Sequence, residues 1–213
     1  MDTKISAYNN FHLKRRYVKQ DLVSILQHLY RITSDWNQKR FVSFGAEDGY
    51  ILVEAHKLWG KDMLYIGIEG GHRVGNGKEN ELIENAQHMF AQHGMDVHGM
   101  QKETLFETAI SEKHESTMPT NIPTIAHFYD GGIVPKEVML KLYSLIDKFA
   151  GKSIMVFVTS QEKNIDKDDV YADWKHICYH MKNKLGWKLP FEKNIFEEYA
   201  DESTMIALFF QKK

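Results

Sequence analysis

Residues 40–72 of this chain read RFVSFGAEDGYILVEAHKLWGKDMLYIGIEGGH, and this stretch decides the fold. The run Phe41–Phe44 is too short and too apolar for anything except a buried strand. Gly45 and Gly49 follow the run and bracket a tight turn that leads into a helix. The stretch therefore begins with a strand and a glycine turn.

An amphipathic helix and a second strand complete this unit. The helix ends at Gly60, and its apolar stripe has helical spacing: Ile51, Leu52, Ala55, Leu58 and Trp59. The run Met63–Ile68 predicts a second strand with Glu69 at its carboxyl end. Parallel strands joined by a crossover helix need this length, and ligands of such sheets bind at the carboxyl ends of the strands. We therefore expect the chemistry around residues 45–49 and Glu69.

The glycine turn and the acid together fit a nucleoside ligand. A glycine turn lets the backbone approach a ligand closely, and an acid about 20 residues further on can accept hydrogen bonds from a ribose diol. Glu69 follows Gly49 by 20 residues. The alternative interpretation is that the chain turns a sharp corner here and that the Glu69 carboxylate is merely solvated.

Length and composition indicate one soluble domain with a large core, because the chain has 213 residues, 43% hydrophobic and 26% charged. The net charge of −2 argues against a dominant electrostatic attraction to nucleic acid, so such a role would need a local basic patch. The single Cys178 cannot form an internal disulfide. With no signal-like segment and no run of membrane-spanning length, we expect an intracellular protein of the cytoplasm or nucleus that binds no membrane.

The N-terminal part is predicted to be an arm followed by a helix, residues 1–38, and residues 39–213 are predicted to form one Rossmann-like domain. The helix is expected over Tyr17–Ile32, where apolar residues recur at helical spacing. A basic cluster lies at the start of this helix: Lys14, Arg15, Arg16 and Lys19. The cluster could contact an acidic partner, although a charge run at a helix start is more often a solvated face.

Strands and helices alternate through the rest of the chain. The predicted elements are a glycine loop from Gly70, a helix over Lys78–His93, a strand over Met95–Met100, a long connection to Ile122, a strand over Thr124–Asp130, a helix with an apolar stripe from Val138 to Phe149, a strand over Ser153–Thr159, a helix ending at Leu185, and a hairpin of Leu189–Ile195 with Thr204–Gln211. This alternation predicts an α/β protein.

Four features together resemble the class I S-adenosylmethionine-dependent methyltransferases: SFGAEDG at 43–49, YIGIEGG at 65–71, HFYDGG at 127–132 and the C-terminal hairpin. The resemblance spans residues 39–213 and implies a seven-stranded, mostly parallel sheet with helices on both faces and a C-terminal β-hairpin. Gly45 and Gly49 match the first motif of the family. Ser43 stands where that motif carries an acid, and Glu47 stands at its middle glycine.

The resemblance implies S-adenosylmethionine as the cofactor. It carries cofactor binding over to Gly45, Ala46, Glu47, Gly49, Glu69, Gly70 and Glu103. Among these residues Glu69 would bind the ribose hydroxyls. Glu103 would lie near the adenine, or else be a plain surface acid. The catalytic residues by the same resemblance are Tyr129 and Asp130, which would face the transferred methyl group.

The methyl acceptor is also suggested by resemblance. The chain lacks the Asn-Pro-Pro-Tyr motif of enzymes that methylate exocyclic base amines, which makes that substrate class less favoured. Its helical N-terminal extension and its aromatic fourth motif resemble the non-SET histone-lysine methyltransferases. This implies a protein lysine acceptor on a histone-like partner, with Phe128 and Tyr129 lining an amine channel.

Other functions stay open on the residues alone. Ser43 and Glu47 would suit a non-catalytic binding module that keeps the fold without the cofactor. A nicotinamide-dependent oxidoreductase fits the terminal hairpin poorly. His176 and His180 are four residues apart on a predicted helix, but no third ligand accompanies them, so a surface pair is favoured over a zinc site.

Overall fold

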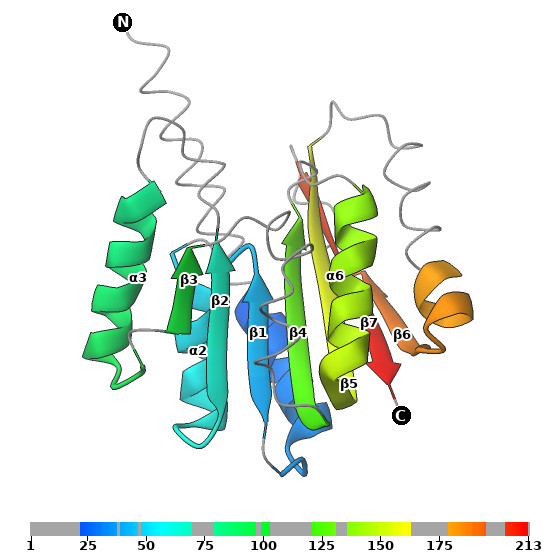
Figure 1. Ribbon diagram of the computed structural model, residues 1–213, viewed down its shortest axis with the longest axis horizontal. Helices are drawn as coiled ribbons and strands as arrows, with labels where there is room; N and C mark the ends of the chain where they lie inside the picture. Colours follow the sequence, from blue (N-terminus) through cyan, green and yellow to red (C-terminus); the bar gives the residue numbers. More distant parts are fainter. Residues whose placement is uncertain are drawn as a thin grey trace, which may run out of the picture.

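The computed structural model describes these residues of the chain: 22–37, 39–46, 48–69, 79–96, 99–102, 121–130, 136–162, 179–194 and 203–212. Within them, strands and helices alternate along the sequence (Figure 1). No helix among these residues is long and apolar enough to cross a membrane.

The strands form one sheet in the order β3-β2-β1-β4-β5-β7-β6. Their bounds are β1 Arg40–Phe44, β2 Leu64–Glu69, β3 Met100–Lys102, β4 Ile122–Asp130, β5 Ala150–Glu162, β6 Lys188–Asn194 and β7 Ser203–Lys212. The first five strands pair in parallel, whereas β7 lies antiparallel between β5 and β6. The carboxyl ends of the parallel strands therefore share one edge, at the top of Figure 1.

Helices lie on both faces of the sheet. Figure 1 shows α6, Lys136–Phe149, in front of the sheet, and α2, Tyr50–Trp59, behind it together with the helix over residues 22–33. The helix α3, Glu79–Gln92, packs into the same core as α2. A π-helical turn at His180–Lys184 precedes β6.

The core behind the sheet combines alternate strand residues with the inner stripes of three helices. Its fully or nearly fully buried members include Phe41, Tyr65, Ile125 and Ile154 from the strands, and Ile25, Leu26, Leu29, Leu52, Ala55, Ala86 and Phe90 from the helices. The period of 2 in the strands and of 3.6 in the helices produces these apolar faces. Burial of this apolar surface is the main favourable term in folding.

The helix over residues 22–33 belongs to this core. The Trp59 indole N–H donates to Thr33 Oγ1 at 3.2 Å, and the Trp59 and Tyr30 rings lie 5.6 Å apart. Residues 1–21 are outside the part of the chain that the structure describes. The predicted boundary between residues 1–38 and 39–213 stays a prediction.

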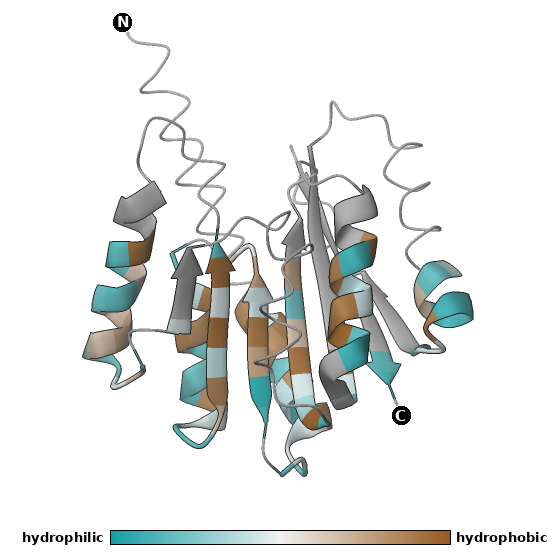
Figure 2. Ribbon diagram, viewed as in Figure 1, coloured by the Kyte–Doolittle hydropathy of each residue, from teal (hydrophilic) through white to brown (hydrophobic). Residues whose placement is uncertain are grey.

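The front face of the sheet is an aromatic stack covered by α6. The Phe44 and Phe128 rings are stacked at 4.5 Å, and Tyr143 of α6 meets Phe128 edge-on at 4.9 Å. Phe128 is fully buried. Figure 2 shows α6 striped in brown and teal, as expected for a helix with one apolar side against the sheet. The expectation that Phe128 lines an amine channel is therefore wrong, because its ring fills this core.

The prediction for the third strand is also wrong, since β3 is Met100–Lys102 and not Met95–Met100. Met95 belongs instead to the end of α3: its N–H donates to Phe90 O at 2.9 Å, and Gly94 takes a left-handed conformation with φ 66°. This arrangement closes a helix, and the buried Met95 side chain covers the core beneath it. An apolar residue that covers the core at the end of a helix thus gives the same local signal as the first residue of a strand.

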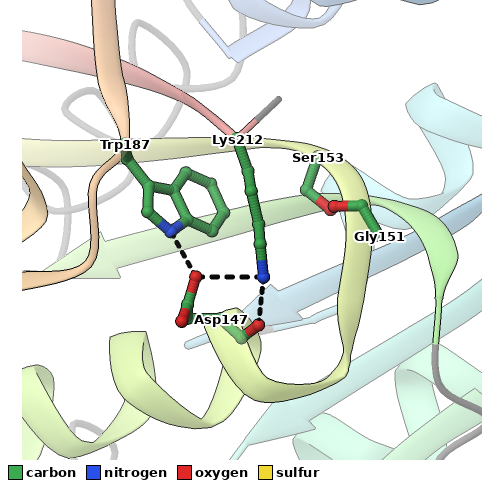
Figure 3. A network of polar contacts seen from close by, with 5 residues as sticks. All are labelled: Asp147, Gly151, Ser153, Trp187 and Lys212. Atoms are coloured by element: carbon green, nitrogen blue, oxygen red, sulfur yellow. Dashed lines mark hydrogen bonds and ion pairs between the residues drawn. The ribbon is translucent and has the colours of Figure 1, made fainter.

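A polar network ties the antiparallel end of the sheet to α6 (Figure 3). The Asp147 carboxylate accepts a hydrogen bond from the Trp187 indole N–H at 2.6 Å and pairs with Lys212 Nζ at 3.1 Å. Lys212 also donates to the Asp147 main-chain carbonyl. Nearby, Ser153 Oγ donates to Gly151 O at 2.9 Å. The network joins α6, the start of β6 and the end of β7, away from the carboxyl edge of the parallel strands.

Candidate functional site

The glycine turn lies directly against the end of β2. Gly45 has φ 74°, a left-handed conformation that favours glycine, and its N–H donates to Ile68 O at 3.0 Å. The Ala46 N–H donates to the same carbonyl at 3.2 Å. Ile68 immediately precedes Glu69, so these bonds bring the turn and the acid to the same point of the sheet edge.

Gly49 ends the turn and begins α2, again with a left-handed φ of 76°. Its N–H donates to Ala46 O at 2.9 Å, which closes the turn. A Cβ atom added at Gly49 would lie 2.9 Å from Phe90 Cε1 and 3.0 Å from Ala86 Cβ. Glycine is therefore required here by the packing of α3, a structural reason that the sequence did not reveal.

Glu69 is the last residue of β2 and is partly exposed. It pairs in register with Lys102, the last residue of β3. The backbone of β3 thus delivers the chain to the same edge one residue before Glu103. Glu47, Gly70 and Glu103 lie outside the described residues.

Tyr129 and Asp130 are the last residues of β4, beside Val158 and Thr159 of β5. Phe128 pairs with Phe44, the last residue of β1, so β4 continues past the point where the glycine turn leaves the sheet. The structure therefore brings the backbone of four predicted site positions to one edge: Gly45, Glu69, Tyr129 and Asp130. Their roles in binding and catalysis stay predictions.

A buried polar pair lies just inside this edge and was missed from the sequence. Ser43 and His127 are register partners on β1 and β4, with Ser43 Oγ 3.0 Å from His127 Nδ1. Ser43 is fully buried and His127 is 1% exposed. Burial lowers the pKa of His127 to about 3, because the charged ring would lose its hydration. The sequence offers two signals for this pair: a histidine within the apolar run of β4, and a serine at the acid position of the first motif.

A Ser–His hydrogen bond is also the starting geometry of a nucleophilic hydrolase. Here the second ring nitrogen, His127 Nε2, has no hydrogen-bond partner among the described residues, so no carboxylate of that part of the chain orients the ring as a general base. The pair does not work as a nucleophilic dyad.

A metal site finds no support within the described stretches, which contain no group of three or more His, Cys, Asp or Glu residues arranged to hold an ion. His176 is outside those stretches. His180 is partly buried, and burial, followed by the nearby Lys184 charge, lowers its pKa.

Comparisons with known proteins identify the fold only through solved structures. No protein-family model and no curated protein matches the sequence. A protein described as a putative rRNA methylase from Clostridium thermocellum is 11% identical, with a TM-score of 0.59, over 88% of this chain and 97% of its own. A SAM-dependent methyltransferase from Aquifex aeolicus is 12% identical, with a TM-score of 0.53, over 89% and 97%.

A third similar structure, precorrin 8w decarboxylase from Methanobacterium thermoautotrophicum, is 14% identical, with a TM-score of 0.53, over 89% of this chain and 90% of its own. The TM-scores demonstrate a shared fold, and the identities are too low to show more than the fold. The decarboxylase among these structures is an example of another activity on the same fold. The expectation of an α/β fold with a mixed sheet, like that of the class I methyltransferases, is confirmed. The chain has the α/β fold of the class I S-adenosylmethionine-dependent methyltransferases.

Proposed function

We propose that this protein is an S-adenosylmethionine-dependent methyltransferase. The observation that carries the proposal is the bond from Gly45 N–H to Ile68 O, which sets a left-handed glycine turn against the strand end that bears Glu69. A turn without a Cβ atom admits a ligand close to the backbone, and the neighbouring carboxylate can accept ribose hydroxyls.

The described residues fit this cofactor in three respects. The turn at Gly45 offers close approach, Glu69 offers a partly exposed acceptor, and His127 offers a buried nitrogen without a partner. When bound, S-adenosylmethionine supplies a methyl group on a positively charged sulfur. Two residues depart from the family motif: Ser43, which is fully buried, and Glu47, which lies outside the described residues.

The acceptor side of the site is assigned to Tyr129 and Asp130 at the end of β4. An amine must lose a proton before it can attack, and a carboxylate at the strand end can take that proton or hold the amine in line. Asp130 is proposed for this step and Tyr129 for positioning the acceptor. Phe128 contributes only indirectly, as core beneath the strand end.

The acceptor itself is proposed to be a protein lysine, on the resemblance to the non-SET histone-lysine methyltransferases. Because Phe128 lies in the core, Tyr129 is the aromatic residue that we propose to line the amine channel. A transfer assay that compares histones, free lysine peptides and nucleic acid, each with radiolabelled cofactor, tests this class directly. Label on nucleic acid alone would contradict the lysine proposal and leave the methyltransferase proposal intact.

A non-catalytic binding module is the second candidate, and two observations favour it. Gly49 is required by contact with Phe90 and Ala86 whether or not a ligand binds, so its presence alone does not demonstrate a working cofactor turn. The neutral pair of Ser43 and His127 in place of an acid also suits a fold that has lost its cofactor.

Isothermal titration with S-adenosylhomocysteine, the demethylated product, separates these candidates. The methyltransferase proposal expects saturable binding, and NADH in the same assay should bind no more tightly than a nonspecific nucleotide. Absence of heat and of thermal stabilisation at millimolar S-adenosylhomocysteine would support the binding module.

A further inference from the structure

His127 belongs to the buried polar pair just inside the edge of the candidate site. Among the described residues its Nε2 atom is buried without a hydrogen-bond partner, while Nδ1 of the same ring lies 3.0 Å from Ser43 Oγ. A buried polar group left unpaired destabilises a folded protein. Native structures pair the great majority of such groups, so an unpaired nitrogen beside a candidate ligand site points to a partner that arrives with the ligand.

Four backbone donors of the turn and of the first turn of α2 are already engaged. Gly45 and Ala46 N–H both donate to Ile68 O, and Gly49 N–H donates to Ala46 O. At the first turn of α2, Asp48 Oδ1 accepts from Tyr50 N–H at 3.2 Å. These four N–H groups are therefore not free to donate to an anionic group that enters beside the turn.

We propose that His127 is a further binding residue, which donates a hydrogen bond from Nε2–H to the carboxylate of the amino-acid portion of the bound cofactor. The inference rests on the proposed function. The 3.0 Å contact between Ser43 Oγ and Nδ1 fits either tautomer of the ring. The proposal assigns the tautomer in which the Ser43 hydroxyl donates to Nδ1 and the neutral ring carries its proton on Nε2. A hydrogen bond from this proton to a carboxylate is charge-assisted and therefore stronger than a neutral one.

Serine at position 43 suits this role better than an acid would. A carboxylate there would draw the proton to Nδ1 and leave Nε2 as an acceptor, which repels an anion. It would also add a negative charge in a buried place close to the ligand carboxylate. A hydroxyl fixes the ring and adds no charge.

The location of the pair supports contact with this part of a ligand. His127 is three residues before Asp130 on β4, and its partner Ser43 is two residues before Gly45. The ring lies on the α2 side of the sheet, because Ser43 shares a face with Phe41 of the core behind the sheet. Nε2 is covered in this structure, so the contact forms as the ligand enters.

Binding measurements with two ligands test the inference. The probes are S-adenosylhomocysteine and its analogue that lacks only the carboxylate. We expect His127→Leu to weaken S-adenosylhomocysteine binding about 10- to 100-fold, as for the loss of a hydrogen bond to a charged group. Binding of the decarboxylated analogue should stay within about threefold, since it makes no such bond.

His56→Leu is the matched control, because the His56 ring packs edge-on against Tyr65 at 5.3 Å on α2 and is not part of the pair. It should leave both affinities unchanged. Thermal unfolding of each variant verifies that it is folded at the assay temperature.

The wild-type protein provides a second measurement if His127→Leu does not fold. In protein labelled with ¹⁵N at histidine, the His127 Nε2–H resonance is assigned through its own backbone signals. It should shift on addition of S-adenosylhomocysteine and stay in place with the decarboxylated analogue. Equal shifts, or equal losses of affinity for both ligands, would overturn the inference while the cofactor proposal stands. If wild-type protein binds neither ligand, the proposed function itself fails.

Discussion

Replacing Gly49 by alanine tests whether the second glycine of the turn is needed for packing. The residue has φ 76°, and a Cβ atom would meet Phe90 Cε1 at 2.9 Å and Ala86 Cβ at 3.0 Å. Both neighbours are fully buried, and neither clashing atom is the end of a flexible side chain. Either α3 must shift away from the turn, or the turn must deform.

The expected cost has two parts. A left-handed conformation costs a non-glycine residue about 1–2 kcal/mol. Forcing a methyl group into a packed core adds about 1–3 kcal/mol. Gly94→Ala is the matched control, because Gly94 has φ 66° and open space around its Cβ position. Gly94→Ala should show only the first part, so Gly49→Ala should be more destabilising by about 1–3 kcal/mol.

Urea unfolding followed by far-ultraviolet circular dichroism measures both free energies of unfolding. A third variant, Gly49→Ala with Phe90→Leu, removes the ring edge that the methyl group meets. The two changes should then couple favourably, by about 1 kcal/mol in a double-mutant cycle. Equal costs for Gly49→Ala and Gly94→Ala, with no coupling to Phe90, would refute the packing argument.

Three further predictions concern the site. Glu69→Ala should weaken S-adenosylhomocysteine binding by about 1–3 kcal/mol in calorimetry. The control Glu54→Ala, which removes an acid on α2, should leave the affinity unchanged. If Glu69→Ala unfolds while its folded fraction binds normally, the role of Glu69 is structural. Asp130→Ala should slow single-turnover methyl transfer while cofactor affinity stays within a few fold. An unchanged rate at equal fold content would mean that Asp130 only stabilises the turn after β4. The unfolded state protonates His127 near pH 6.5 and the folded state only near pH 3, so stability is complete above pH 6.5 and falls as the pH drops through this window. In urea titrations, the free energy of unfolding of His127→Gln should fall by about 2 kcal/mol less between pH 7 and pH 5 than that of the wild-type protein. An equal fall in both proteins would contradict the assignment of this pH dependence to His127.

Most of the fold could be predicted from the sequence because its signals are local. Apolar residues at the period of a strand or a helix mark which face is buried, whichever partner buries it. Glycines with positive φ end the helices where the sequence places them, at Gly60 after α2 and at Gly94 after α3. The sequence therefore revealed the alternation of strands and helices and the edge at which Gly45 and Glu69 meet.

The third strand was misplaced because the same local signal has two causes. Met95 is apolar since it covers the core at the end of α3, and nothing in the residues around it distinguishes that role from a strand. Phe128 was assigned to the site for a similar reason. Its place in the core depends on Phe44 and Tyr143, which approach it only in the folded protein.

The tertiary structure alone decided the roles that depend on distant partners. Ser43 and His127 are 84 residues apart and meet because of the register between β1 and β4, which no local pattern reports. The need for glycine at position 49 comes from α3, a separate helix. The sequence by itself determined which residues are buried and where the chain turns, because solvent exclusion and backbone conformation act residue by residue. Which buried groups become partners is set by strand register and helix docking, and these exist only once the whole sheet has formed.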